Sequence, residues 1–350
     1  MPVLTRGALL CLAVAGVAGH MRAESASPSP SASYSVTGVA LPGAAPGGVF
    51  MDYIAYDAAR HRVWIPAGNT GSVAVIDAKT DSVTPVTGFP TTEVERGGRK
   101  RTVGPSSASV GEGVVFVGNR GDSSVCGIGA VSLVKGACLT LDSMPDGVAY
   151  VAATKEVWVT TPRDKSIRIL DASKPGALTA KAKVAFDGEP EGYAVDNARG
   201  TFFTNLEDKD RTLAIDVRSR KTVKTWLPQC GEDGPKGLAL EAGNDFLVVA
   251  CSDHVEVLDA GHDGQILSKL DTGAGVDNID YVASRRELFA AASAAARLTI
   301  ARLDAQGHLT AAASVDTAKG ARNAVATEAG VAYLTDSPEG KVLVVRPATR

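Results

Sequence analysis

The sequence predicts an all-β protein whose repeated four-stranded units close into a ring. The apolar runs are short and separated by Gly, Asp, Asn and Pro, which is typical of strands rather than helices. Similar units recur at roughly 40 to 45 residues, the spacing of a four-stranded propeller blade. Segments such as FLVV and VVFV carry large apolar groups on both strand faces, as blades stacked around an axis require. Together these observations predict a seven-bladed β-propeller with antiparallel blades.

The repeat is clearest at residues 144 to 172, MPDGVAYVAATKEVWVTTPRDKSIRILDA, where a Pro-acid-Gly step precedes three short apolar strands. Related units start at residues 51, 105, 145, 190, 235, 276 and 321. The first gap is longer because it contains TTEVERGGRKR, residues 91 to 101. We interpret this insertion as a loop with a solvated surface.

An aspartate recurs at the end of the third strand in five units. Its side chain can accept backbone N–H groups from the following turn. We therefore predict a structural, non-catalytic role for these residues, which are Asp77, Asp171, Asp216, Asp259 and Asp304.

The two ends of the repeat region predict how the ring closes. The last unit supplies only three strands, ARNAVAT, GVAYLTD and KVLVVR, and SYSVTGVALP at residues 33 to 42 precedes the first complete unit. Pairing this segment as the outer strand of the last blade removes an open sheet edge. We therefore place the propeller at residues 34 to 348.

The first 23 residues have the pattern of a cleaved signal peptide. Arg6 precedes the apolar run GALLCLAVAGVAG, which is too short for an ordinary transmembrane helix. Residues 24 to 33, ESASPSPSAS, are typical of a disordered Ser/Pro linker. We expect a periplasmic or secreted protein, monomeric and without a membrane span.

Four cysteines follow the signal segment. An even number in an oxidising compartment favours disulfides over metal ligation. The repeat places Cys126 and Cys138 on the third and fourth strands of the second unit. Cys230 precedes the inner strand of the fifth unit, and Cys251 ends its second strand. We predict the pairs Cys126–Cys138 and Cys230–Cys251.

Units such as EVWVTTPRDKSIRILDA and RVWIPAGNTGSVAVIDAKTDSV resemble the YVTN-type propellers, the YncE-like group of the larger WD40-like seven-bladed superfamily. The resemblance covers roughly residues 34 to 348 and implies the fold. Related propellers serve as binding modules, lactonases and electron-transfer subunits, so the resemblance does not select a function.

The residues that enter the innermost strands form the candidate site, because these strands line the channel of a propeller. Charged groups that converge on one opening are candidates for ligand binding. An alternative is that they pair with one another and with water around a solvated channel. The aligned positions are Asp52, Ser106, Asp146, Glu191, Lys236, Asp277 and Arg322.

Other chemistry has little support in the sequence. The net charge of −3 and the lack of an aromatic platform beside the basic insertion argue against nucleic acid. No histidine pair has metal-ligand spacing, and no Cys-x-x-Cys-His or Gly-x-Ser-x-Gly motif occurs. Arg120-Gly121-Asp122 spells an adhesion tripeptide, but a turn after a strand explains it.

We therefore predict a non-catalytic scaffold without a cofactor, which binds a small-molecule ligand or a protein. The alternative is a divalent-metal-dependent lactonase or hydrolase. The PDG-V-A and PEG-Y-A steps resemble those of gluconolactonase-like propellers, which bind a divalent ion at such a mouth. Lys236 and Arg322 would bring positive charge beside that ion. A third hypothesis is a subunit of a redox enzyme whose cofactor lies on another chain. In the metal-dependent alternative, the oxygen ligands for Ca²⁺, or for Zn²⁺, would come from Asp52, Asp146, Glu191, Asp277 and Asn278.

Overall fold

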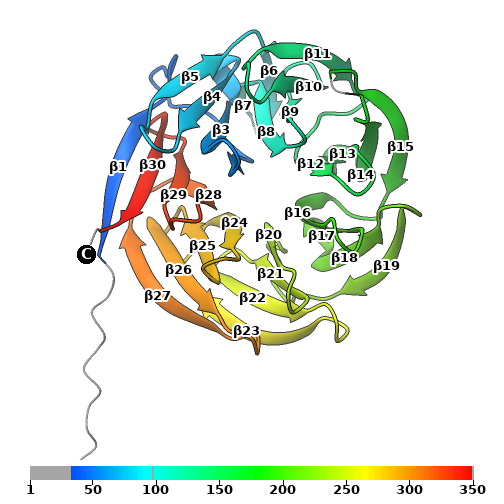
Figure 1. Cartoon of the computed structure of the whole chain (residues 1–350), viewed down its shortest axis with the longest axis vertical. Coiled ribbons are helices and arrows are strands. Elements are labelled where there is room, and N and C mark those ends of the chain that lie inside the picture. The colour runs from blue at the N-terminus through cyan, green and yellow to red at the C-terminus, as the bar shows by residue number, and fades with distance from the viewer. Residues whose placement is uncertain (1–32, 97, 175, 349–350) are drawn as a thin grey trace, which may run out of the picture. The chain divides into compact units, whose positions relative to one another are not determined.

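A computed structural model describes residues 33–348 except 97 and 175. Within this range, seven four-stranded antiparallel sheets stand around a central channel (Figure 1). The predicted seven-bladed β-propeller is confirmed. The predicted signal peptide, and all of the predicted linker except Ser33, lie outside the described residues.

The first six blades run in chain order from the innermost to the outermost strand. Blade one has β2 (Ala55–Asp57), β3 (Arg62–Ala67), β4 (Ser72–Asp77) and β5 (Val83–Val86). Blade two has β8 (Pro105–Val110), β9 (Val114–Asn119), β10 (Ser124–Gly129) and β11 (Lys135–Thr140). Blade three has β12 (Val148–Val151), β13 (Glu156–Thr161), β14 (Ser166–Asp171) and β15 (Thr179–Ala185).

The next three blades have the same order. Blade four has β16 (Pro190–Asp196), β17 (Thr201–Leu206), β18 (Arg211–Asp216) and β19 (Lys221–Trp226). Blade five has β20 (Leu238–Glu241), β21 (Phe246–Ala250), β22 (His254–Asp259) and β23 (Gln265–Asp271). Blade six has β24 (Val276–Val282), β25 (Glu287–Ala292), β26 (Arg297–Leu303) and β27 (Leu309–Asp316).

The seventh blade joins the two ends of the chain. It contains β28 (Ala321–Ala326), β29 (Ala332–Asp336), β30 (Lys341–Pro347) and, at its outer edge, β1 (Tyr34–Ala40). The antiparallel register of β1 and β30 runs from Tyr34 opposite Pro347 to Ala40 opposite Lys341. Figure 1 shows the blue first strand beside the red last one. The predicted closure by the N-terminal strand is confirmed, and it removes an open edge.

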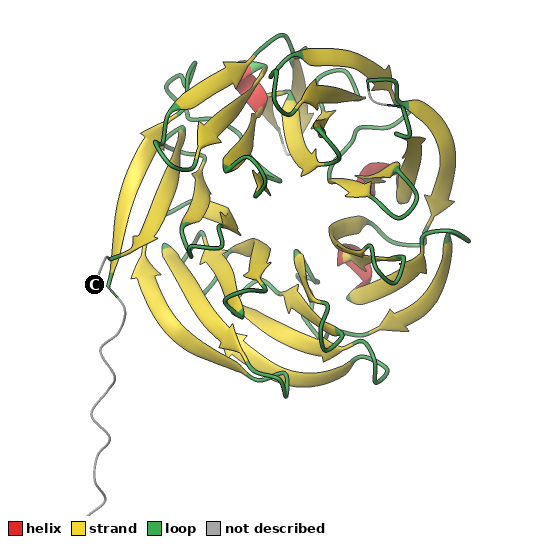
Figure 2. Ribbon diagram, in the orientation of Figure 1, coloured by secondary structure: helices red, strands yellow, loops and turns green. Residues whose placement is uncertain are grey.

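The remaining elements are short. The insertion forms a hairpin of β6 (Thr92–Arg96) and β7 (Arg99–Val103). Three single 3₁₀ turns follow second strands, η1 (Gly68–Thr70), η2 (Pro162–Asp164) and η3 (Glu207–Lys209). Figure 2 shows how completely strands dominate the architecture. No helix in the described part of the chain is long and apolar enough to cross a membrane.

The core lies between the blades. All six residues of β13 are buried, as the apolar groups on both of its faces predict. Trp158 of blade three stacks on Phe202 of blade four, with their ring centroids 4.8 Å apart, and both side chains are fully buried. Burial of one such side chain contributes about 1.5–3 kcal/mol. Packing between neighbouring blades therefore holds the inner strands, and the site they carry, in a fixed ring.

The recurring third-strand aspartates are turn caps, as predicted. Oδ1 of Asp77 accepts a hydrogen bond from the backbone N–H of Lys79 at 2.9 Å, and Oδ1 of Asp171 accepts one from Ser173 at 2.9 Å. These bonds hold the pKa values of Asp77 and Asp171 below their usual range. Equivalent backbone hydrogen bonds are made by Asp216, Asp259 and Asp304.

Both predicted cysteine pairs lie at disulfide distance. Cys126 on β10 stands directly opposite Cys138 on β11, with 4.1 Å between their Cα atoms. Cys230 precedes β20, and Cys251 directly follows β21, with a Cα–Cα distance of 5.2 Å. Paired cysteines of this kind are typical of oxidising, extracellular surroundings.

Candidate functional site

Six of the seven predicted ring residues line one cavity, which we call the mouth. It has a volume of about 630 Å³ and lies at the end of the channel where the innermost strands begin. The seventh residue, Ser106, is fully buried and does not line the mouth. The six residues are Asp52, Asp146, Glu191, Lys236, Asp277 and Arg322.

Local irregularities in the innermost strands direct these side chains. Glu191 pairs with Asn205 and Tyr193 with Thr204, so that Gly192 is an extra residue in β16. Such a bulge bends the strand and re-aims the neighbouring side chain. The hydroxyl of Thr204 stabilises the bulge by donating to the carbonyl oxygens of Glu191 and Gly192, at 2.9 and 3.1 Å. β28 has the same shift after Arg322, whose carbonyl accepts from the hydroxyl of Thr335 at 2.7 Å.

The inner strands also approach one another very closely. A Cβ atom on Gly192 would lie 2.0 Å from the carbonyl oxygen of Lys236 on the next blade. Only glycine leaves room for this contact. The Gly that follows the acid in the Pro-acid-Gly step therefore sets the spacing of the ring.

Arg120 is a site residue that the sequence analysis missed. It lies in the turn after β9, and its side chain is 9% exposed. The guanidinium lies 2.9 Å from Oδ2 of Asp52 and donates a hydrogen bond to Oδ1 of Asp146. Burial disfavours its charge, but the carboxylates of Asp146 and Asp52 outweigh this effect and raise the pKa of Arg120. The sequence predicted a turn at Arg120, but it did not predict that the side chain of Arg120 would line the mouth.

A second guanidinium extends this network around the ring. Arg322 donates to Oδ2 of Asp277, and its Nη2 atom lies 3.5 Å from Oδ1 of Asp52. Acids and bases therefore alternate in the order Asp146, Arg120, Asp52, Arg322 and Asp277. The alternative that the charged groups of the mouth pair with one another therefore holds for these five side chains.

Glu191 stands outside that network. Its Oε1 atom accepts a hydrogen bond from the hydroxyl of Tyr53 at 2.7 Å, and no basic side chain in the described part of the chain forms an ion pair with it. Burial, together with the charges of Asp146 and Asp277, raises its pKa well above the ordinary range. Glu191 and Asp146 both line the mouth, and each affects the pKa of the other. Oδ2 of Asp146 is buried and has no hydrogen-bond donor among the described residues.

The hairpin β6–β7 and the turn η3 complete the mouth. Val94, Arg101 and Val103 of the hairpin line the cavity, and the Arg101 guanidinium lies 4.8 Å from the centre of the Phe50 ring. The interpretation of the insertion as a solvated surface is therefore incomplete, because one side of it forms a wall of the mouth. On η3, Glu207 forms an ion pair with Lys236.

The mouth residues do not form a compact set of metal ligands. Within residues 33–348, less the two gaps, no three mouth carboxylates bring oxygen atoms within 4.8 Å of one another. Asp52, Asp146 and Asp277 instead accept from guanidinium groups. The five proposed ligands therefore do not fit a Ca²⁺ site, which needs six to eight oxygens at about 2.3–2.6 Å.

Fold and site together define a seven-bladed β-propeller with a charged, ligand-sized cavity at one end of its channel. Similar folds occur in several solved structures. Virginiamycin B lyase from Staphylococcus aureus is 12% identical with a TM-score of 0.68, covering 90% of this chain and 99% of that one. A chain of Kuenenia stuttgartiensis hydrazine synthase is 14% identical with a TM-score of 0.70, covering 87% and 97%.

A chain of the mitotic checkpoint complex is 14% identical with a TM-score of 0.68, and covers 93% of this chain and 98% of its own. At these identities the likeness shows the fold alone. No protein-family model matches the sequence, and no curated protein matches it.

Proposed function

We propose that this chain is an exported, non-catalytic propeller of the YVTN type, which binds the cationic group of a small molecule or peptide in its mouth. One observation carries the proposal: Asp146 and Glu191 line the same mouth, Oδ2 of Asp146 is buried without a hydrogen-bond partner, and Glu191 has no cationic partner among the described residues. The five-residue network holds two guanidiniums against three carboxylates. With Glu191 ionised, these six groups carry a net charge of −2, and a monovalent cation between Asp146 and Glu191 would reduce it to −1.

A primary ammonium would supply the positive charge and the N–H donors that Asp146 and Glu191 lack. It offers three N–H donors and would compete with a proton for the Glu191 carboxyl, whose pKa is raised. The binding would therefore release a proton. Because the proton and the ligand compete for one place, affinity should fall as the pH is lowered through the raised pKa of Glu191.

The proposed family and compartment are supported by different features. The strand-turn-strand repeats resemble those of YVTN-type propellers, and the observed fold is the one that this family would have. The two cysteine pairs and the pattern of the first 23 residues support export. The lactonase alternative is less well supported, because guanidiniums hold three of its five proposed metal ligands.

The test is isothermal titration calorimetry with a diamine and with a short peptide whose amino terminus is free or acetylated. We expect cadaverine and the free peptide to bind, and the acetylated peptide to bind at least about tenfold more weakly, because it lacks the charge. Glu191→Gln and Asp146→Asn should each weaken binding to a similar extent. Glu112→Gln is the matched control, since Glu112 lies in the turn between β8 and β9 and does not line the mouth.

The outcomes separate the hypotheses. Amines that bind the control and both mouth variants equally, or bind none of them, would refute an ammonium site in the mouth. Lactone hydrolysis that is lost after treatment with a chelator would establish the metal-dependent alternative.

A further inference from the structure

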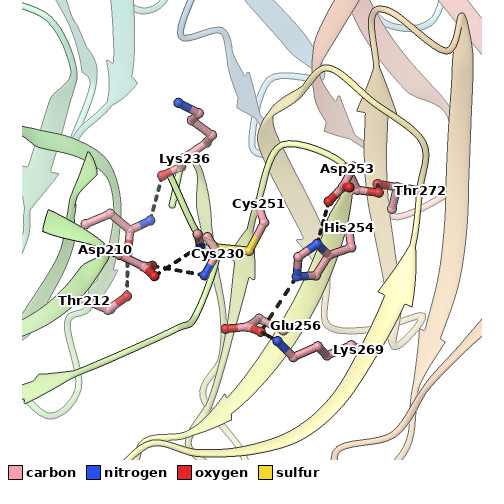
Figure 3. Close-up of a disulfide and its surroundings, with 12 residues drawn as sticks. Asp210, Thr212, Cys230, Lys236, Cys251, Asp253, His254, Glu256, Lys269 and Thr272 are labelled. Atoms are coloured by element: carbon pink, nitrogen blue, oxygen red, sulfur yellow. Dashed lines mark hydrogen bonds and ion pairs between the residues drawn. A yellow bond between two sulfur atoms is a disulfide. The ribbon is translucent and has the colours of Figure 1, made fainter. Parts of the chain in front are cut away.

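A second polar cluster lies beside the disulfide of blade five. The two Sγ atoms of Cys230 and Cys251 and a carboxylate oxygen of Glu256 all lie within 4.8 Å of one another. Figure 3 shows this carboxylate and the imidazole of His254 on the same side of the disulfide. His254 and Glu256 are two residues apart on β22, so their side chains leave the same face of the strand.

Two buried acceptor atoms in this cluster lack hydrogen-bond donors. Glu256 is fully buried, and although Lys269 lies 2.9 Å from its Oε2 atom, its Oε1 atom has no hydrogen-bond partner. Nε2 of His254 is also buried without a partner, and it lies 3.9 Å from Oε2 of Glu256. A structural salt bridge between Glu256 and Lys269 leaves both of these atoms unexplained.

The imidazole is held as metal-ligating histidines are held. Nδ1 of His254 lies 2.7 Å from Oδ1 of Asp253, and donation of the Nδ1 hydrogen to that carboxylate leaves the lone pair on Nε2. A carboxylate behind the ring fixes its tautomer and orientation in most metal sites that contain histidine. The lone pair then faces Glu256 and the disulfide (Figure 3).

We propose that reduction of the Cys230–Cys251 disulfide opens a Zn²⁺ site formed by the two thiolates, the Glu256 carboxylate and Nε2 of His254. Zinc prefers four sulfur, nitrogen and oxygen ligands in a tetrahedron, with bonds of about 2.0–2.3 Å. Ligand atoms in such a site are about 3.3–3.8 Å apart. The Glu256 carboxylate lies within 4.8 Å of both sulfurs, so it needs at most a small movement, and the imidazole of His254, which lies outside that group, must move closer to the sulfurs. The two sulfurs must separate, and Cys230 can move because it lies in a loop and is only partly buried.

The chemistry balances with a phosphine as reductant. The disulfide accepts two electrons from the phosphine, which takes the oxygen of one water molecule, and each sulfur receives one of that water's protons. Zinc binding then releases both thiol protons. The disulfide and the zinc site use the same sulfurs, so they exclude each other and the metal is expelled upon oxidation.

The test uses the full chain with Cys11→Ser, Cys126→Ser and Cys138→Ser, so that Cys230 and Cys251 are the two cysteines that remain. After reduction with a phosphine and its removal under argon, Co²⁺ serves as a spectroscopic probe and Zn²⁺ is titrated against a chromogenic chelator. We expect one equivalent of Co²⁺ with thiolate-to-cobalt charge-transfer bands, and no such bands before reduction. Zn²⁺ should displace the Co²⁺ and protect both thiols from alkylation.

Ligand variants make the assignment specific. Asp253→Asn, which removes the partner of a ligand, should weaken Zn²⁺ binding by about 10- to 100-fold, and Glu256→Gln and His254→Asn, which remove ligands, should weaken it at least as much. Glu241→Gln is the control, because its carboxylate lies in the same blade but bonds only within its own turn. If reduction loosens the blade, Zn²⁺ should still raise the melting temperature of the reduced chain, because the metal binds only the folded site. A reduced chain that shows no charge-transfer band, or binding that is unchanged in Glu256→Gln, would overturn the proposal.

Discussion

Replacement of Arg120 by methionine tests whether the ion network of the mouth stabilises the fold. Methionine keeps much of the length of the side chain but removes the guanidinium, which lies 2.9 Å from Asp52 and also contacts Asp146. Asp52 keeps Arg322 at 3.5 Å and the amide of Asn323 at 3.3 Å. Asp146 loses the one cation that forms an ion pair with it in the described part of the chain. Removal of one partner from a buried pair costs about 3–5 kcal/mol, and we expect a loss in this range.

The loss should depend on pH. Burial already raises the pKa of Asp146, although Arg120 opposes the shift, so Arg120→Met should raise it further. A carboxyl whose pKa is higher in the folded than in the unfolded chain destabilises the fold when ionised. The penalty should therefore be larger at about pH 8 than at about pH 4, because it shrinks as the pH falls through the raised pKa of Asp146.

Urea unfolding, followed by tryptophan fluorescence at both pH values, measures this difference. Arg163→Met is the control, because Arg163 lines the mouth but is exposed, and a surface change of this kind stays within about 0.5 kcal/mol. The double variant Arg120→Met/Asp146→Asn should recover part of the loss. A cost that is equal at both pH values, or no larger than that of the control, would refute this reasoning.

Three further predictions concern the whole propeller. Deletion of residues 34–42 removes the seven paired positions of β1. It should lower the free energy of unfolding by about 5 kcal/mol and cause aggregation through the exposed edge of β30. A deletion variant that melts like the parent would contradict the closure. Replacement of Cys126 and Cys138 by alanine opens a loop of 12 residues. It should lower the free energy of unfolding, measured by calorimetry, by about 3 kcal/mol. An unchanged melting temperature would count against the disulfide. Burial, partly offset by Arg322, raises the pKa of Asp277 to about 6. Because this is above its ordinary value, stability should fall as the pH rises from about 4 to about 6, by up to about 3 kcal/mol, and urea unfolding should show a flatter profile for Asp277→Asn.

The parts of the fold that the sequence predicted are those that repeat. A third-strand aspartate such as Asp171 caps its own turn, so the few residues around it suffice to predict its hydrogen bonds. The count of strands in the last unit left one place for the N-terminal strand, which β1 occupies. The cysteine pairs followed from the positions of Cys126 and Cys230 within their units, since antiparallel strands bring those positions beside their partners.

The site was predicted only in part. Alignment of the units found the six residues that begin the inner strands, but not Arg120, which reaches the mouth from the turn after β9. A second alignment, of the residues that follow each second strand, would have drawn attention to Arg120 and Glu207. Tyr53 and the hairpin wall could not be found in this way, because their contacts with Glu191 and Phe50 join segments that share no repeat position.

The amino-acid sequence by itself thus determined the number of blades, the closing strand and six of the residues that line the mouth, because strand period and turn chemistry are local and recur in every unit. The tertiary structure decided which charges are neutralised. Arg120 and Arg322 form ion pairs with Asp52, Asp146 and Asp277, and Glu191 has no cationic partner among the described residues. Such pairing depends on the distances between blades and on burial, and neither is established until the ring has closed. The same burial raises the pKa of Glu191.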